Sequence, residues 1–134
     1  MISVDTGALI ALLDRSDSYH EVAKRCFASL REPLITTYPV ITEACYLLRH
    51  IEKCNLLRSL SAGAIEMFAL EIHHISRMLE LIEQYADLPM DFADASLVVL
   101  AETLGHGRII TVDQRDFGIY RWQNSQPFEN LLFS

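Results

Sequence analysis

The sequence has few cysteines and no paired cysteine motif, and this shortage excludes two kinds of small protein. Its three cysteines, Cys26, Cys45 and Cys54, are odd in number and form no CxxC pair. Neither a disulfide framework nor a cysteine-ligated zinc site is therefore expected. A reducing environment such as the cytoplasm is the setting that this cysteine content favours.

Long apolar runs are also missing. No uninterrupted apolar stretch approaches the roughly 20 residues that cross a bilayer. Asp5 and Asp14 bracket the only apolar run near the N-terminus, which therefore does not read as a secretory signal. We expect no association with a membrane. With 134 residues, of which 51% are hydrophobic and 22% charged, the chain is expected to form a single domain over residues 1–134.

Basic residues are outnumbered, since 11 lysines and arginines face 18 aspartates and glutamates and the formal net charge is -7. This balance excludes a protein that coats nucleic acid without sequence preference, because such binding comes mostly from lysine and arginine. It does not exclude a nuclease. A site that holds divalent metal must concentrate carboxylates, and the bound metal then reverses the local field that a phosphate meets.

Short β-prone segments alternate with helical patterns along the chain. We expect strands at residues 2–5, 34–37, 71–75 and 108–112, and a last short strand within 128–134. Helical periodicity predicts a helix that follows Thr6 as its N-cap and runs to residue 13, further helices at 20–30, 41–50, 53–70 and 76–86, and one within 88–105 that Gly105 stops. This alternation favours an α/β fold with a parallel sheet that is covered on both faces.

Four acidic residues stand in otherwise apolar surroundings. Asp5 and Asp113 end predicted strands, whereas Glu43 and Asp94 lie near the beginnings of predicted helices. The carboxyl ends of parallel strands share one edge, where ligands bind in such sheets. Carboxylates that meet in one pocket repel unless a cation compensates them, and their oxygens suit Mg²⁺ or Mn²⁺.

Each acid taken singly has a simpler interpretation. Asp5 and Asp113 could cap the helices that follow them. Glu43 could be a solvated helix residue, and Asp94 could complement a helix dipole from the first turn. The sequence alone leaves these alternatives open.

Four ordered motifs together resemble the PIN domain family, and within it the toxin ribonucleases of the VapC type. They are VDTGALIALL, PVITEACYLL, MDFADASLVVLAE and IITVDQRDF, so the resemblance covers nearly the whole chain. It implies a three-layer α/β/α fold with a central parallel sheet, an acid cluster that binds Mg²⁺ or Mn²⁺, and endoribonuclease activity. It also implies an RNA substrate, a cognate antitoxin and a homodimer.

The resemblance assigns roles residue by residue. The family's four acids fall on Asp5, Glu43, Asp94 and Asp113, with Asp5, Asp94 and Asp113 as metal ligands and Glu43 as a ligand or as the group that orients the attacking water. The positions that match or adjoin the family's auxiliary residues are Thr6, Thr111, Asp116 and Asp91. Two nearby basic residues are candidates for contacts with substrate phosphates: Arg115 and Arg121.

Two other functions compete with this one. A non-catalytic PIN-like module that binds RNA or protein would fold identically but would lack metal-dependent turnover. A receiver domain would need paired acids after the first strand and a lysine near the last, and the sequence supplies neither. His73 and His74, in a predicted strand, would point to opposite faces and could not share one ion.

Overall fold

The computed structural model describes residues 1–133 and contains a five-stranded, entirely parallel sheet. The strand order is β3-β2-β1-β4-β7, and the bounds are Ile2–Val4 for β1, Leu34–Thr36 for β2, Ile65–Met67 for β3, Arg108–Ile110 for β4 and Glu129–Asn130 for β7. Ser3 of the central strand pairs with Ile35 on one side and with Ile109 on the other. Because β1 lies inside the sheet, all three of its residues are buried, as expected for a strand covered on both faces.

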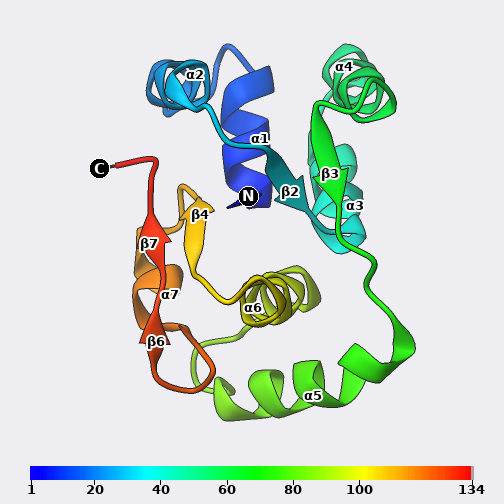
Figure 1. Cartoon of the computed structure of the whole chain (residues 1–134). Coiled ribbons are helices and arrows are strands. Elements are labelled where there is room, and N and C mark those ends of the chain that lie inside the picture. The colour runs from blue at the N-terminus through cyan, green and yellow to red at the C-terminus, as the bar shows by residue number, and fades with distance from the viewer. Residues whose placement is uncertain (134) are drawn as a thin grey trace.

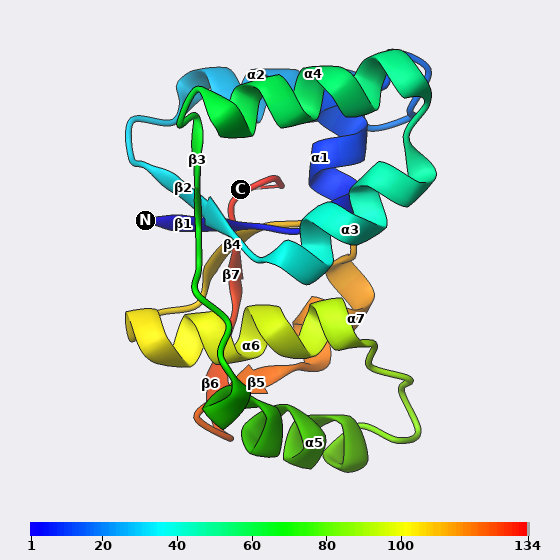
Figure 2. The same ribbon diagram turned by 90° about the vertical axis from the view of Figure 1, so that its right-hand side faces the viewer.

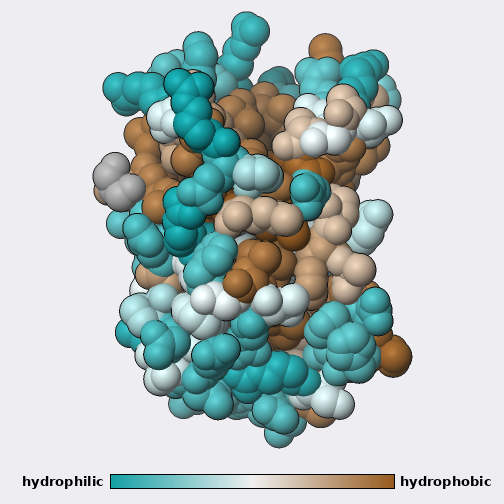
Figure 3. All heavy atoms as spheres, viewed as in Figure 1, coloured by the Kyte–Doolittle hydropathy of each residue, from teal (hydrophilic) through white to brown (hydrophobic). Residues whose placement is uncertain are grey.

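Helices cover both faces of the sheet and make three layers (Figures 1 and 2). One face carries α1 (Thr6–Leu13), α2 (His20–Ser29), α3 (Tyr38–Leu47) and α4 (His50–Ser61). The other carries α5 (Ile75–Gln84) and α6 (Phe92–Leu104). Figure 3 shows apolar residues gathered across the middle of one side of the molecule, between more polar surfaces above and below. The predicted three-layer α/β/α architecture is confirmed.

Short elements complete the chain. A 3-10 turn, η1 (Ile72–His74), leads into α5, and α7 (Gln114–Ile119) follows β4. A small antiparallel hairpin joins β5 (Arg121–Trp122) to β6 (Gln126–Pro127). No helix within residues 1–133 combines the length and the apolar character that crossing a membrane requires.

Most of the predicted elements are confirmed, and three predictions were wrong. The helix predicted for 53–70 ends at Ser61, and Ile65–Met67 forms the edge strand β3. Residues 71–75, predicted as a strand, form η1 and the start of α5. The N-cap of α1 is Asp5 rather than Thr6. The last strand falls on Glu129–Asn130 within the predicted 128–134, of which Ser134 lies outside the described residues.

Helix α1 packs closely against the segment that follows β4. A Cβ added at Gly7 would collide with the Val112 side chain, whereas one at Gly118 in α7 would meet no atom within 4 Å. We expect Gly7→Ala to lower the free energy of unfolding by about 1–3 kcal/mol, as overpacking does. The matched change Gly118→Ala is expected to be neutral or to stabilise by up to about 1 kcal/mol. Urea denaturation compares the two, and equal effects would contradict the close approach at Gly7.

Candidate functional site

A cavity at the carboxyl edge of the sheet gathers six carboxylates. It has a volume of about 390 Å³, and its acidic lining residues are Asp5, Glu43, Asp91, Asp94, Asp113 and Asp116. The carboxyl edge of the sheet, where the cavity lies, is toward the right of Figure 2, where α1 and α6 begin. All four acids predicted as catalytic, and both predicted as auxiliary, therefore line one space.

Asp5 is held at the end of β1 with only 6% of its surface exposed. Its backbone N–H donates to the Ile110 carbonyl over 3.0 Å, so the ends of β1 and β4 lie side by side. Its carboxylate accepts from the Thr6 backbone N–H at 2.7 Å and from Thr111 Oγ1 at 2.8 Å. Burial raises the pKa of Asp5 to about 6, although these hydrogen bonds oppose the rise.

Thr111 links the two acids that end neighbouring strands. Its hydroxyl donates to Asp5 and accepts from the Asp113 backbone N–H at 2.9 Å. Asp113 in turn caps α7, because its Oδ1 accepts from the Asp116 backbone N–H at 2.9 Å. Helix capping and membership of the acid cluster are thus compatible, for Asp113 as for Asp5.

Asn130 of β7 fixes Thr111 from the other side. Its side-chain amide donates to the Thr111 carbonyl at 2.9 Å and accepts from the Thr111 backbone N–H at 3.2 Å. Both main-chain groups of Thr111 are therefore paired beyond the end of β4. This role of Asn130 is not predicted by the sequence, because a lone asparagine in the last strand carries no local signal of it.

Asp94 enters the cavity from the first turn of α6. Asp91 caps that helix and accepts from the Asp94 backbone N–H at 2.7 Å. Burial, followed by the charges of Asp91 and Asp5, raises the pKa of Asp94 to about 8. The Tyr120 hydroxyl donates to Asp94 Oδ2 at 3.1 Å, and the ring of Tyr120 is buried. Tyr120, like Asn130, is a residue of this site that the sequence motifs do not predict.

Glu43 faces the cavity from α3, beside a buried threonine hydroxyl. Burial, together with the neighbouring Asp91 carboxyl, raises the pKa of Glu43, while the nearby Thr6 hydroxyl opposes the rise. That hydroxyl, Thr6 Oγ1, is buried and lies outside hydrogen-bond geometry with every described residue. An unpaired buried hydroxyl is costly, and here it lies in the wall of a space that could admit a water or an ion.

Helix α3 is fixed to α6 by a buried pair of hydroxyls. Thr37 Oγ1 lies 2.7 Å from Ser96 Oγ, and Ser96 Oγ donates to the Ala93 carbonyl at 2.6 Å. Because the single Ser96 proton is used in that second bond, Thr37 is the donor between the two hydroxyls. The two helices that carry Glu43 and Asp94 are therefore held in register.

The donor set of this cavity fits a hard divalent cation. Six carboxylates line it, and none of the described residues that line it is a lysine, arginine or histidine, so a bound cation would compensate charges that the lining itself leaves unpaired. Within residues 1–133, however, no three acidic, histidine or cysteine side chains are already arranged to hold an ion. Asp5 and Asp94 instead accept hydrogen bonds from protein donors.

The two predicted phosphate contacts lie outside the acid cavity. Arg121 Nη1 donates to three backbone carbonyls: those of Gly118 at 2.9 Å, Ile119 at 3.1 Å and Tyr120 at 2.9 Å. Its guanidinium group therefore caps the C-terminal end of α7. Arg115 lies on α7 near Asp116, whose pKa it lowers, although burial and Asp113 raise that pKa overall. Contact of either arginine with a substrate phosphate stays a prediction.

The adjacent histidines do not point to opposite faces, as the strand prediction required. In η1 the rings of His73 and His74 lie with their centroids 4.0 Å apart. The Glu71 backbone N–H donates to His74 Nδ1 at 2.9 Å. This pair therefore belongs to the start of α5 and lies outside the acid cavity.

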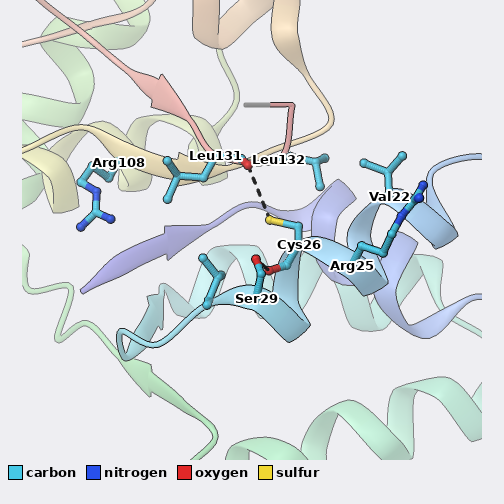
Figure 4. Close-up of a pocket in the computed structure, with 8 residues that line it drawn as sticks. Val22, Arg25, Cys26, Ser29, Arg108, Leu131 and Leu132 are labelled. Carbon is cyan, nitrogen blue, oxygen red and sulfur yellow. Dashed lines mark hydrogen bonds between the residues drawn. The ribbon is translucent and has the colours of Figure 1, made fainter.

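A separate cavity of about 480 Å³ lies between α2 and the end of β7 (Figure 4). Cys26 Sγ donates to the Leu131 carbonyl at 3.6 Å across it. Arg108 at its rim is paired with Glu32 at 2.6 Å. None of the predicted site residues lines this cavity.

Comparison with known proteins identifies the family. The model of the PIN domain matches residues 2–121. The chain is 30% identical over 122 residues to ribonuclease VapC26 of Mycobacterium tuberculosis, covering 88% of this chain and 90% of that protein. It superposes with a TM-score of 0.75 on the crystal structure of Mycobacterium tuberculosis VapC20, described as a sarcin-ricin loop cleaving toxin, at 20% identity over 86% of this chain and 92% of that one. The motifs, the three-layer fold and the matched span agree, and the chain belongs to the PIN domain family.

Proposed function

We propose that this protein is a metal-dependent endoribonuclease, the toxin of a toxin-antitoxin pair. The observation that carries the proposal is the acid cavity itself, in which six carboxylates converge and no basic residue is among the described residues of the lining. The similarity to ribonuclease VapC26 supports RNA as the substrate. A cognate antitoxin, a homodimer and a cytoplasmic location are parts of the same proposal.

In this mechanism Asp5, Asp94 and Asp113 are the residues that would hold Mg²⁺ or Mn²⁺. The ion would lower the pKa of a water molecule and neutralise charge that develops on the phosphate. Thr111 fixes Asp5 and the Asp113 backbone, and Tyr120 fixes Asp94. Glu43 orients the attacking water and accepts its proton, a role favoured by the raised pKa of its carboxyl.

Cleavage of structured RNAs, including transfer RNAs, by the purified protein tests the proposal. We expect cutting in Mg²⁺ or Mn²⁺ and none in excess EDTA. Asp5→Asn, which keeps a side chain able to cap α1, is expected to slow cleavage by about 10²-fold or more, as loss of one electrostatic contact to a reacting group does. Gel electrophoresis of end-labelled RNA measures both effects.

The alternative is a non-catalytic PIN-like module. A folded, antitoxin-free protein that cuts no RNA and shows no calorimetric binding of Mg²⁺ or Mn²⁺ would favour that module over the proposal. Cutting that persists unchanged in EDTA would reject the metal dependence and leave the ribonuclease activity.

A further inference from the structure

The side chain of Asn130 continues the strand pairing beyond the point where β4 ends. Strand β7 is the last strand in the order β3-β2-β1-β4-β7, and its register with β4 ends at the pair of Ile109 and Asn130. Thr111 follows β4 directly, and its carbonyl and N–H both bind the Asn130 carboxamide, at 2.9 and 3.2 Å. A side chain therefore replaces the main chain of a neighbouring strand as the partner of Thr111.

The chemistry of the carboxamide explains why an asparagine stands at this position. Asn130 Oδ1 also accepts from the Leu132 backbone N–H at 3.1 Å, so one side chain ties the chain after β7 to the chain after β4. Pairing with both main-chain groups of one residue requires a donor and an acceptor side by side, which a carboxamide supplies. Asparagine is otherwise depleted in strands. These hydrogen bonds, rather than strand propensity, account for Asn130 in β7.

Thr111 transmits this constraint to two of the candidate metal ligands. Its side chain is buried and β-branched, so it has few rotamers, and a fixed main chain fixes the direction of its hydroxyl. That hydroxyl donates to Asp5 Oδ2 at 2.8 Å and accepts from the Asp113 backbone N–H at 2.9 Å. The position of one carboxylate relative to the other therefore depends on where Asn130 holds the Thr111 main chain.

We propose that Asn130 is a positioning residue of the acid cavity, which sets the spacing of Asp5 and Asp113 through Thr111 and thereby the affinity of the cavity for Mg²⁺ or Mn²⁺. This inference rests on the proposed function, because the ion is the one proposed there. It makes the edge strand β7 part of the site. Residues that orient metal ligands from outside typically change metal affinity or activity by about 10- to 100-fold when they are replaced.

A purely structural role for Asn130 is the competing explanation. Loss of its hydrogen bonds would then loosen β7 and lower the melting temperature, but the protein that remains folded would bind metal as before. Asn130→Ala is expected to lower the melting temperature under either explanation, because the Thr111 main chain loses its partners. The measurement that decides is therefore the metal affinity of the folded protein, well below its melting temperature.

The test is a double-mutant cycle between Asn130 and the Thr111 hydroxyl. Thr111→Val removes that hydroxyl and keeps the main-chain groups that Asn130 binds. Isothermal titration calorimetry measures Mn²⁺ binding, and we expect Asn130→Ala to raise the Mn²⁺ dissociation constant by about 10-fold or more. Cleavage in limiting Mn²⁺ should slow in proportion, with an unchanged KM for RNA. When Thr111→Val is already present, Asn130→Ala should raise the dissociation constant by less than about 2-fold, because the connecting hydroxyl is gone.

Two further variants separate positioning from stability. Asn130→Thr introduces a residue with a higher strand propensity but without the paired donor and acceptor, so it is expected to keep β7 folded and still to weaken Mn²⁺ binding. Asn55→Ala is the control, since Asn55 is exposed on α4 and its Oδ1 accepts from Arg58; it is expected to change neither affinity nor cleavage. An unchanged Mn²⁺ dissociation constant in Asn130→Ala and Asn130→Thr would overturn the inference, as would equal effects of Asn130→Ala with and without the Thr111 hydroxyl.

Asp5→Asn, measured beside these variants, separates this inference from the proposed function. Mn²⁺ binding and RNA cleavage that require Asp5 but are unaffected by Asn130→Ala would overturn the positioning role alone. An unaltered protein that neither binds Mn²⁺ nor cleaves RNA would overturn both.

Discussion

Replacing Asp94 with asparagine is expected to abolish activity and to raise stability at the same time. Cleavage should fall by about 10²-fold or more, because a carboxylate that contacts the reacting groups is lost. The melting temperature of the metal-free protein, measured at neutral pH, should stay unchanged or rise. These opposite effects are the signature of a residue retained for its charge rather than for packing.

The structural reason is the environment of the Asp94 carboxyl. Burial and the charges of Asp91 and Asp5 raise its pKa to about 8, so ionising this group in the folded state costs free energy near neutral pH. Asparagine carries no charge, and its Oδ1 can still accept from the Tyr120 hydroxyl. The substitution therefore relieves repulsion without breaking the hydrogen bond to Tyr120.

Asp87→Asn is the matched control, since Asp87 is exposed and lies outside the acid cavity. It is expected to change neither cleavage nor melting temperature. Retained turnover in Asp94→Asn would contradict its assignment as a catalytic residue. A melting temperature that falls well below that of Asp87→Asn would instead mean that Asp94 is a structural residue.

The sequence predicted the acid cluster well because position in a parallel sheet determines which residues meet. Asp5 and Asp113 both follow apolar strands, and parallel neighbours bring such positions to one edge. Asp94 lies in the first turn of a strongly apolar helix whose end is marked by Gly105, a left-handed C-cap at φ 78°. Local pattern and chain topology agree at these three positions.

The prediction failed between residues 61 and 75, where pairing partners are distant. Gly63 has a φ of 81° and follows the C-cap of α4, so it ends the helix rather than interrupting it. Ile65–Met67 is too short to show a two-residue period, and it becomes a strand only because Leu34–Thr36 lies beside it. Residues 71–75 have the composition of a strand but begin the helical turn before α5.

Contacts made by single side chains could not be predicted from the sequence either. Tyr120 and Asn130 reach the acid cluster from segments after β4, and neither belongs to a spacing motif. Their contacts depend on where the end of α7 and strand β7 lie relative to α6 and the end of β4. A pattern of carboxylates indicates where a site lies, whereas the residues that orient those carboxylates are found only in the folded chain.

The stability of the metal-free protein is expected to fall as pH rises from about 5 to about 8.5. The pKa of Asp5 rises from 3.8 to about 6 and that of Asp94 from 3.8 to about 8. Between the ordinary and the raised values the folded protein binds more protons than the unfolded chain, so the free energy of unfolding decreases as pH increases. A fall in melting temperature of at least about 4 °C in EDTA corresponds to roughly 1 kcal/mol for a domain of this size.

Mg²⁺ or Mn²⁺ should reverse this fall, and more strongly at high pH than at low pH. Protons and cations compete for the same carboxylates, so near pH 5 the protons already compensate the repulsion and a cation adds little. Differential scanning fluorimetry across this range, with EDTA or with saturating Mn²⁺, measures the difference. The double variant Asp5→Asn with Asp94→Asn should flatten the pH dependence in EDTA and remove most of the metal response. A melting temperature that rises with pH in EDTA would mean that other groups of the chain already compensate the negative charge of these carboxylates. Binding of a divalent cation would then not be the reason why they converge.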